Sequence, residues 1–548
     1  MTSSPRHNPE THADICLLLE GTYPFIRGGV STWVKQLIEG MPELTFSIIF
    51  LGTKEDDYGE PAYELPENLV HIQMCYLLDE TEAIEKSPSL LQKLKAASRK
   101  DKEKYAVNED MHTLLADDAK SDSDSDSGGI STGQADASFD SNFDSNQIIR
   151  NFTRILSGDL QIDQEELHYG RESWETIRRK YLKAPPGLDF NHYFWSIRGM
   201  HKPLFTIGKA AENPPSADLY HSVSTGYAGF LGAMLQSKSG KPFIISEHGI
   251  YTKERELDIA QVDWIPDEFN QFQVGLNEEM GYLRSIWIRF FKSLGRMSYA
   301  SASQVYTLYN GNRLRQISDG CPEDKLEIIP NGVDIEKFKS VRRSADAEIP
   351  PVLGLIGRVV PIKDIKNFIR AMRVIRETLP DAQGWLIGPQ DEDEDYFEEC
   401  KLLVENLELE DTVIFKGFQN PTDMFPQLGL NVLTSVSEGQ PLTTLEGYAA
   451  GIPALTTDVG SCSELICGVS EEDRAIGTSG AVVPISNPTL FAEAALELLT
   501  DREKWSEARD AAIERVETFY SDKEMIGRYR QIYQSYLQNA SAAKRKAS

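Results

Sequence analysis

Short apolar runs alternate with longer amphipathic stretches along this 548-residue chain, and this alternation is the feature that most restricts its fold. A short apolar run that ends in a polar or glycine-containing loop is typical of a buried parallel strand, and an amphipathic stretch behind it is typical of a covering helix. Residues 14–19 (DICLLL), 30–40 and 46–51 (FSIIFL) form the first strand–helix–strand unit. The pattern therefore predicts an α/β protein with parallel sheets.

The strand and helix signals fall into two series, separated by a polar connector near residue 345. Strands are also expected at 218–222, 242–246, 304–308 and 326–330 in the first series, and at 352–356, 384–387, 413–415, 430–434, 454–457 and 481–483 in the second. We predict two Rossmann-like, doubly wound domains, residues 1–345 and 346–515, that face each other across a cleft. Residues 516–548 are expected to form a helix that packs back on the N-terminal domain, with a dimer contact as the alternative.

An acidic insertion interrupts the first series. Residues 121–146 include SDSDSDSGGISTG and contain no Lys or Arg. A segment with so little apolar surface is not expected to build a core, so we predict a mobile insertion at about 80–185. Cation binding by its Asp run is the alternative.

The charge of the chain limits its partners. Against 85 Asp and Glu there are 56 Lys and Arg, which gives a formal net charge of −29. Such a balance argues against nucleic acid as a partner and against electrostatic binding to anionic lipid. The opening MTSSPRHNPE has no apolar signal segment and no apolar run is long enough to span a bilayer, so we expect a cytoplasmic protein.

Glycines and cations occur in loops that follow predicted strands. Gly28 and Gly29 precede a predicted helix, where glycine lets backbone amides approach an anion; a plain tight turn is the alternative. Arg358 and Lys363 follow the first strand of the second series and can both reach a diphosphate, unless they are ordinary surface cations. We expect Lys363 to face solvent, so that its replacement by alanine lowers turnover far more than stability.

A pair of glutamates marks the third loop. Glu438 lies in the loop after the strand at 430–434, and Glu446 lies eight residues later on the next helix. Carboxylates accept hydrogen bonds from vicinal sugar hydroxyls. The amides of Leu442 and Thr443 are expected at the N-terminus of that helix, where they suit a phosphate. A capped surface helix with one exposed Glu is the alternative.

These motifs together resemble a known enzyme family. The stretches that carry the resemblance are EGTYPFIRGGVSTWV, EHGIYTKERELDI, IPNGVD, GRVVPIK and SEGQPLTTLEGYAAGIPALTTDVGS. They resemble the retaining glycosyltransferases of family 4 (GT4), which have the GT-B fold, and among these the PelF-type glycosyltransferases of Pel exopolysaccharide biosynthesis. The resemblance covers most of the chain except the leader and the Asp/Ser insertion.

The resemblance implies roles for individual residues. The family's diphosphate-binding cations match Arg358 and Lys363, which also stabilise the leaving group, and its amino-terminal glycine loop matches Gly28 and Gly29. The glutamate on ribose hydroxyls matches Glu446, and the one on the transferred sugar matches Glu438. His248 matches a histidine near the donor sugar, with a core histidine as the alternative. The matched roles imply hexosyl transfer from a nucleoside-diphosphate sugar, with a UDP-sugar favoured.

One departure from the family pattern lies beside these residues. Many members have Phe-Gly-Leu where this chain has Gln440, Pro441 and Leu442. Proline has no N–H, so the amides of Leu442 and Thr443 must serve the phosphate. The segment 331–334 matches a motif expected to be structural.

The resemblance also implies partners, and alternative functions remain. The expected acceptor is a growing exopolysaccharide or related glycan, the expected recipient is a membrane polysaccharide-synthase complex, and inner-membrane placement would be peripheral, through protein partners. The rivals are a sucrose or glycogen synthase type of transferase, and a non-catalytic GT-B scaffold subunit. No metal or other cofactor is expected, because the Asp-x-Asp matches at 122–126 and 391–395 lie in acidic runs outside the strand-end loops.

Overall fold

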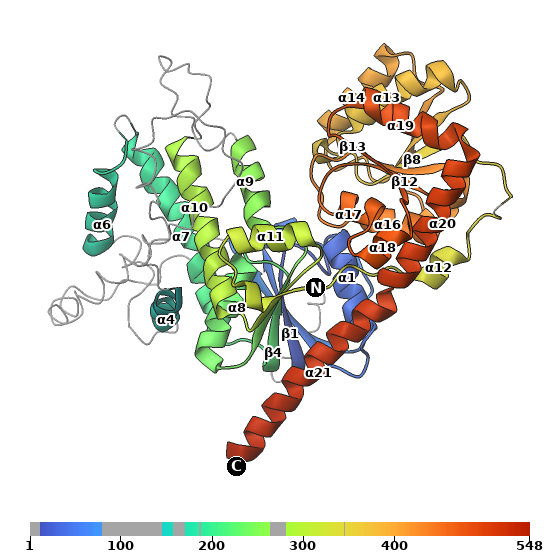
Figure 1. Cartoon of the computed structure of the whole chain (residues 1–548). Helices are drawn as coiled ribbons and strands as arrows, with labels where there is room; N and C mark the ends of the chain where they lie inside the picture. The colour runs from blue at the N-terminus through green and yellow to red at the C-terminus, as the bar shows by residue number, and fades with distance from the viewer. Residues whose placement is uncertain are drawn as a thin grey trace, which may run out of the picture. The chain divides into compact units, whose positions relative to one another are not determined.

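The computed structural model describes residues 11–78, 145–156, 170–185, 188–262, 281–344 and 346–547 (Figure 1). The described residues divide into two compact units. Unit 1 is drawn from Met1–Tyr306, Leu314–Glu327 and Ile532–Ser548, and unit 2 from Thr307–Arg313 and Ile328–Gln531. The units therefore do not divide at the expected residues 345 and 516. Residues 328–344 belong to unit 2 because Val333 forms a parallel bridge with Ser521 at the end of helix α20 (Arg502–Phe519).

Unit 1 is built on a seven-stranded sheet of the doubly wound type, with the order β3-β2-β1-β4-β5-β6-β7. The strands are β1 Ala13–Glu20, β2 Phe46–Gly52, β3 Leu69–Tyr76, β4 Ala217–Ser222, β5 Phe243–Glu247, β6 Gln304–Thr307 and β7 Leu326–Ile328. The pairs from β3 to β5 are parallel. The order reverses between β1 and β4, so their carboxyl ends, next to Glu20 and Ser222, are where a ligand site is expected.

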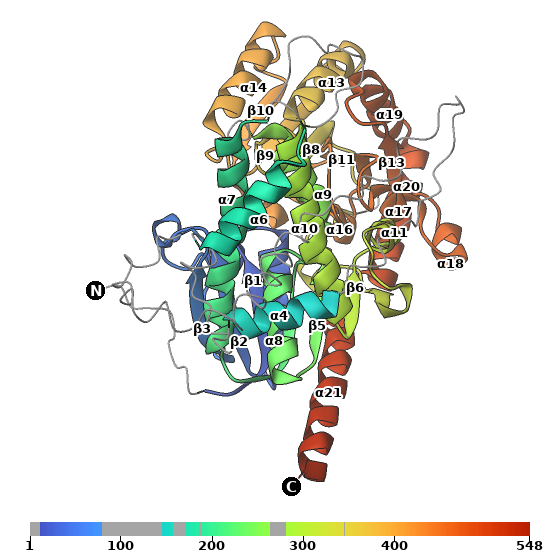
Figure 2. The same cartoon turned by 90° about the vertical axis from the view of Figure 1, so that its left-hand side faces the viewer.

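Helices supply most of the unit 1 core. They include α1 (Gly29–Glu39), α7 (Phe190–Glu212), α8 (Tyr227–Ser239), α9 (Tyr251–Gln261) and α10 (Tyr282–Ser301). Helix α11 (Asn310–Ser318) is divided between the two units. Helix α8 packs between α7 and α10, and Figure 2 shows the three side by side. Residues 227–235 of α8 are all buried, because helices cover it where the sheet does not.

Two helices correct the prediction of a mobile insertion at about 80–185. Helices α4 (Ser145–Leu156) and α6 (Arg171–Tyr181) lie inside that range. In α4, Ile148, Ile149 and Phe152 are buried at helical spacing, and Phe152 packs edge-on against Phe230 of α8. These helices belong to the core because they carry an apolar face, which the Asp/Ser run lacks. That run, including residues 121–144, lies outside the described residues.

Unit 2 is built on a six-stranded parallel sheet with the order β10-β9-β8-β11-β12-β13. The strands are β8 Val352–Ile356, β9 Gln383–Ile387, β10 Val413–Gly417, β11 Leu430–Leu433, β12 Ala454–Thr457 and β13 Gly480–Val483. The helices include α12 (Ile335–Lys339), α13 (Ile365–Thr378), α14 (Glu394–Asn406), α16 (Leu442–Ala449), α17 (Cys462–Cys467), α18 (Glu471–Ala475) and α19 (Pro488–Thr500). The prediction of two doubly wound α/β sheets is confirmed.

The last helix, α21 (Asp522–Ala547), contributes residues to both units. Within unit 1, its Tyr533 is fully buried, and the Tyr533 hydroxyl lies 2.7 Å from Nδ1 of His221 on β4. The other ring nitrogen of His221 lies 2.8 Å from Oγ of Ser246. Burial lowers the pKa of His221 to about 3, so this hydrogen-bonded imidazole is neutral at pH 7.

None of the helices in the described ranges is long and apolar enough to cross a membrane.

Candidate functional site

Lys363 and Glu438 meet at the carboxyl ends of two neighbouring strands of unit 2. Lys363 ends the short turn Pro361–Lys363 that follows β8, and Glu438 lies in the loop that follows β11. The Lys363 Nζ donates a hydrogen bond of 2.5 Å to Oε1 of Glu438, and the hydroxyl of Ser435 donates one of 2.6 Å to the same oxygen. Adjacent parallel strands end at the same edge of the sheet, which brings the two loops together.

The prediction that Lys363 faces solvent is wrong. The side chains of Lys363 and Glu438 are only 19% and 14% exposed. The two loops are also bonded to each other: Val436 N donates to the Ile362 carbonyl at 2.9 Å, and Thr434 Oγ1 donates to the Lys363 carbonyl at 2.8 Å. Lys363 is thus part of a fixed, charge-paired strand-end site.

Arg358 has a different carboxylate partner. Its Nη1 forms an ion pair with Glu392, which lies between β9 and α14, and both side chains are about half exposed. The predicted diphosphate ligands, Arg358 and Lys363, therefore each have an acidic partner. A diphosphate that binds both cations has to compete with these carboxylates. Glu392, in the exposed pair with Arg358, competes less strongly than Glu438 does for Lys363.

Glu446 lies on helix α16, which begins at Leu442 in this same strand-end loop. Its carboxyl group is half-buried, and burial raises its pKa to about 7, although the charge of Lys337 on α12 acts in the opposite direction. The first-turn amides of Leu442 and Thr443 have no acceptor within a helix, which is the arrangement that binds phosphate at helix N-termini. The Nδ2 of Asn431 holds the carbonyl of Thr443 at 2.8 Å.

The pKa of Glu446 predicts a pH dependence for nucleoside binding. An ionised carboxylate accepts hydrogen bonds from ribose hydroxyls, so affinity should rise about tenfold from pH 6 to pH 8. A nucleoside is the right probe because it has no phosphate that titrates in this range. The affinity of Glu446→Gln should be flat over the same range, as measured by calorimetry. A flat profile in the wild type would contradict ribose binding by Glu446.

The same pKa has a consequence for stability. Because the folded-state pKa lies above the ordinary value of 4.5, the folded protein favours the protonated carboxyl. This contribution to stability is fully present below pH 4.5 and is lost as the pH rises through 7. Glu446→Gln is expected to remove that pH dependence.

The segment 331–334, expected to be structural, is bonded to the loop that carries Glu438. The backbone N–H of Asn331 donates to Oε1 of Gln440 at 2.6 Å, and its Nδ2 donates to the Gln440 carbonyl at 3.4 Å. Both residues are buried. Asp334 caps α12, with its carboxylate accepting from the Lys337 N–H. The structural role of this motif is therefore seen in direct contacts.

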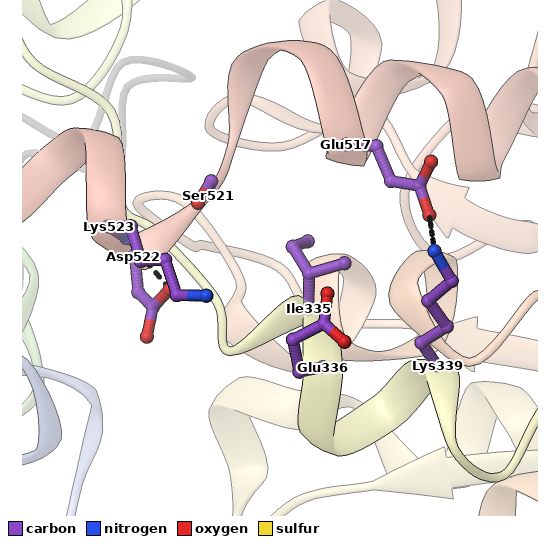
Figure 3. Close-up of a pocket in the computed structure, with 7 residues that line it drawn as sticks. All are labelled: Ile335, Glu336, Lys339, Glu517, Ser521, Asp522 and Lys523. Atoms are coloured by element: carbon purple, nitrogen blue, oxygen red, sulfur yellow. Dashed lines mark hydrogen bonds and ion pairs between the residues drawn. The ribbon is translucent and has the colours of Figure 1, made fainter.

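A polar pocket of ≈ 270 Å³ lies beside α12, at the junction of α20 and α21 (Figure 3). Its lining residues are Ile335, Glu336, Lys339, Glu517, Ser521, Asp522 and Lys523. Lys339 of α12 pairs with Glu517 of α20 at 3.8 Å, so this contact joins α12 to α20. None of the predicted site residues lines the pocket.

Gly28, Gly29 and His248 lie in unit 1 around helix α1. Gly28 precedes the helix with extended backbone, and a Cβ built on Gly28 would meet no atom within 4 Å. His248 is 6% exposed and packs edge-on against Trp33 of α1, with ring centroids 4.5 Å apart. Burial lowers the pKa of His248 to about 4, so at pH 7 it is a neutral group and supplies no positive charge.

The open space at Gly28 allows a sharp test. Neither packing nor backbone conformation requires glycine there, so Gly28→Ala should leave the melting temperature within about 2 °C of the wild type. If a diphosphate lies against this loop, the added methyl group should lower kcat/KM at least about tenfold. Gly59→Ala is the matched control, since Gly59 is exposed in the same unit and also has open space around its Cβ position. Equal activity of the two variants would show that the loop of Gly28 is not part of the site.

Ser435, Lys337, Gln440 and Glu392 lie in the site but were not predicted from the sequence as functional. Ser435 lies two residues after β11, so the same strand-end argument could have found it. Lys337 opposes the charge of Glu446 across two helices that are far apart in the sequence. Gln440 was noted only as a departure from the family pattern, and its partner could not be inferred from its position.

Comparison with known proteins gives two family matches. The model described as "Domain of unknown function (DUF3492)" matches residues 13–324, which is more than half of the chain. The model described as "Glycosyl transferases group 1" matches residues 336–516, the part that contains Arg358, Lys363, Glu438 and Glu446.

Curated relatives match a part of the chain. It is 27% identical over 219 residues to "Lipopolysaccharide core biosynthesis mannosyltransferase LpsB" of Rhizobium meliloti, covering 38% of this chain and 61% of the relative. It is 28% identical over 197 residues to "N-acetyl-alpha-D-glucosaminyl L-malate synthase" of Bacillus anthracis, covering 35% and 48%. The chain thus spans about half to three fifths of the length of these relatives.

Solved structures match nearly the whole chain in fold. HepE of Anabaena in complex with UDP aligns with a TM-score of 0.54 at 13% identity, covering 95% of this chain and 100% of HepE. Sucrose-phosphate synthase of Thermosynechococcus elongatus aligns with a TM-score of 0.54 at 14% identity, covering 96% and 100%. These neighbours have the GT-B fold, so the predicted fold is confirmed. The chain belongs to the family described as "Domain of unknown function (DUF3492)", and it carries a "Glycosyl transferases group 1" domain.

Proposed function

We propose that this protein is a retaining glycosyltransferase that moves a hexosyl unit from a nucleoside-diphosphate sugar to a glycan acceptor. The observation that carries the proposal is the Lys363–Glu438 pair at adjoining strand ends of the group 1 domain. Arg358 lies on the same strand-end loop as Lys363, and Glu446 lies on the helix that follows Glu438. One sheet edge thus offers cations for a diphosphate and carboxylates for sugar hydroxyls.

The charge changes of the reaction assign a role to each group. When the bond between sugar and phosphate breaks, negative charge builds on the diphosphate and positive charge on the anomeric carbon. Lys363, Arg358 and the amides of Leu442 and Thr443 stabilise the diphosphate. The acceptor hydroxyl attacks from the side of the leaving group and gives its proton to a phosphate oxygen. Glu438 orients hydroxyls of the transferred sugar and forms no covalent intermediate.

For the donor we propose a UDP-sugar, and for the acceptor a growing exopolysaccharide of the PelF type or a related glycan. The UDP proposal is supported by the fold shared with HepE, which was solved in complex with UDP. The acceptor proposal rests on the sequence motifs that resemble PelF-type enzymes. The same resemblance supports a cytoplasmic protein that passes its product to a membrane synthase complex through protein contacts.

A thermal-shift panel tests donor binding. UDP, ADP and GDP and their sugars should be compared at saturating concentration, and one base is expected to raise the melting temperature by several degrees. If the protein is instead a sucrose or glycogen synthase type of transferase, it should prefer the donor of that type of enzyme and transfer the sugar to that enzyme's acceptor. A scaffold subunit predicts no shift with any nucleotide, which would contradict the proposal.

Metal removal gives an independent prediction. No cluster of three or more His, Cys, Asp or Glu in the described ranges is placed to hold a metal ion. With Arg358 and Lys363 as the diphosphate ligands, turnover should stay within about twofold after dialysis against EDTA. Loss of activity that Mg²⁺ or Mn²⁺ restores would contradict this division of roles.

A further inference from the structure

The side chain of Gln440 fixes the loop that carries Glu438. Its Oε1 accepts the backbone N–H of Asn331 at 2.6 Å, and its carbonyl accepts Nδ2 of Asn331 at 3.4 Å. Gln440 and Asn331 are 7% and 4% exposed. Because water has little access there, a buried N–H without an acceptor is costly, and Gln440 supplies that acceptor.

Gly460 and Ser461 also hold this loop, through contacts with Glu438 and Gly439. Ser461 N donates to the Gly439 carbonyl at 2.9 Å. A Cβ on Gly460 would lie 2.3 Å from that carbonyl oxygen and 2.5 Å from the carbonyl oxygen of Glu438, so only glycine allows this approach. The loop is therefore clamped at Gly439 and tied at Gln440, immediately before the amides of Leu442 and Thr443.

Asn331 is itself part of a rigid segment. Val333 N donates to the Tyr520 carbonyl at 2.9 Å, and Asp522 N donates to the Val333 carbonyl at 3.1 Å. A Cβ on Gly332 would lie 2.5 Å from Cα of Asp522, so the two backbones are in close contact. The partner that Gln440 binds is thus fixed to the junction of α20 and α21.

We propose that Gln440 is a positioning residue that ties the loop of Glu438, Leu442 and Thr443 to the fixed Asn331–Val333 segment. This inference rests on the proposed function, since it assigns the orientation of the proposed donor-binding groups. The side chain touches no substrate in this account; it acts through the loop.

Two substitutions separate the tether from simple packing. Gln440→Met keeps the length and volume but removes the acceptor, whereas Gln440→Glu keeps an Oε atom at the same reach. We expect Gln440→Met to lower kcat about thirtyfold, because small displacements of groups at the reacting centre are costly. The affinity for the nucleoside should change less than about threefold, since Asn431 holds α16 independently through Thr443. Gln440→Glu should recover kcat to within about fivefold of the wild type.

Asn331→Ala is the matched control. It removes only the 3.4 Å bond from Nδ2 and leaves the backbone N–H in place. We expect it to retain far more activity than Gln440→Met. Wild-type kcat in Gln440→Met, or equal losses in Gln440→Met and Gln440→Glu, would overturn the proposal.

Amide hydrogen exchange over residues 436–443 measures how firmly the loop is held, and it needs no substrate. Exchange should be faster in Gln440→Met than in the wild type and should return toward the wild-type rate in Gln440→Glu. If Gln440→Met fails to fold, Gln440→Asn takes its place. Its side chain is one methylene too short to reach the Asn331 N–H, so exchange should again be faster than in the wild type. Unchanged exchange overturns the tether. Faster exchange in a protein that binds no nucleotide would instead leave the tether in place and contradict the proposed function.

Discussion

Replacing Lys363 with alanine is expected to lower kcat/KM for sugar transfer at least about a hundredfold, as is found when a preorganised charge-stabilising group is removed. The ammonium group is held at 2.5 Å by Glu438 and lies in a strand-end loop that is bonded to its neighbour. Its position is thus set before the donor binds, which is what stabilisation of a leaving diphosphate requires. Steady-state kinetics with the donor found in the nucleotide panel measures the effect.

Lys366→Ala is the matched control for charge. Lys366 lies in the first turn of the next helix, α13, and also pairs with a glutamate, Glu399, but it has no place in the proposed site. Its replacement should leave kcat/KM within about twofold of the wild type. Equal losses in Lys363→Ala and Lys366→Ala would show that the loss follows from removing a positive charge and not from the position of Lys363.

Lys363→Ala should also destabilise the protein, because Glu438 loses its partner in a site that is largely buried. We expect a loss of about 1 kcal/mol, less than for a fully buried pair because solvent still reaches both groups. The double variant Lys363→Ala, Glu438→Gln should regain stability without regaining activity. A double variant that recovers turnover would contradict the role of Lys363.

The largest loss of stability is expected from Asp473→Ala. Asp473 on α18 accepts a bond of 2.6 Å from Nε of Arg515, and Arg515 is fully buried. Removing one partner of a buried ion pair leaves a charge without compensation, at a cost of about 3–5 kcal/mol. Urea denaturation measures the change in the free energy of unfolding.

Glu472→Ala is the control for Asp473→Ala, since Glu472 is exposed on the same helix. It should change the free energy of unfolding by less than about 0.5 kcal/mol. The guanidinium of Arg515 also donates to the carbonyls of Ile466, Asp473 and Gly477. A loss below about 1 kcal/mol in Asp473→Ala would mean that these carbonyls alone satisfy the arginine.

The first two strands were predictable because they are apolar on both faces. Residues of β1 and β2 read as continuous apolar runs because helices cover both sides of the sheet. The edge strand β3 was missed because polar residues, among them His71 and Gln73, interrupt its pattern. Helix α7 was missed as well, and its Pro203 is a residue that ordinarily ends a helical pattern.

Residue positions in the site were predictable, but side-chain partners were not. Strand-end reasoning placed Lys363 and Glu438 in loops that the sheet brings together. It could not show that they pair, since side-chain direction depends on packing between loops 75 residues apart. Glu392, the partner of Arg358, lies in the acidic run at 391–395, which was expected to lie outside the strand-end loops, and Asp393 of the same run caps α14. A run of acidic residues shows the composition of a segment but not the positions or partners of its side chains.

The stereochemistry of donor turnover tests the central claim most directly. The protein should be incubated with the nucleotide sugar that binds, and NMR should follow the anomeric signal of the first sugar product. We predict release of the nucleoside diphosphate and a product with the same anomeric configuration as the donor, both lost in Lys363→Ala. Release of no nucleoside diphosphate from any UDP-, ADP- or GDP-sugar, or a first product of inverted configuration, would contradict the account.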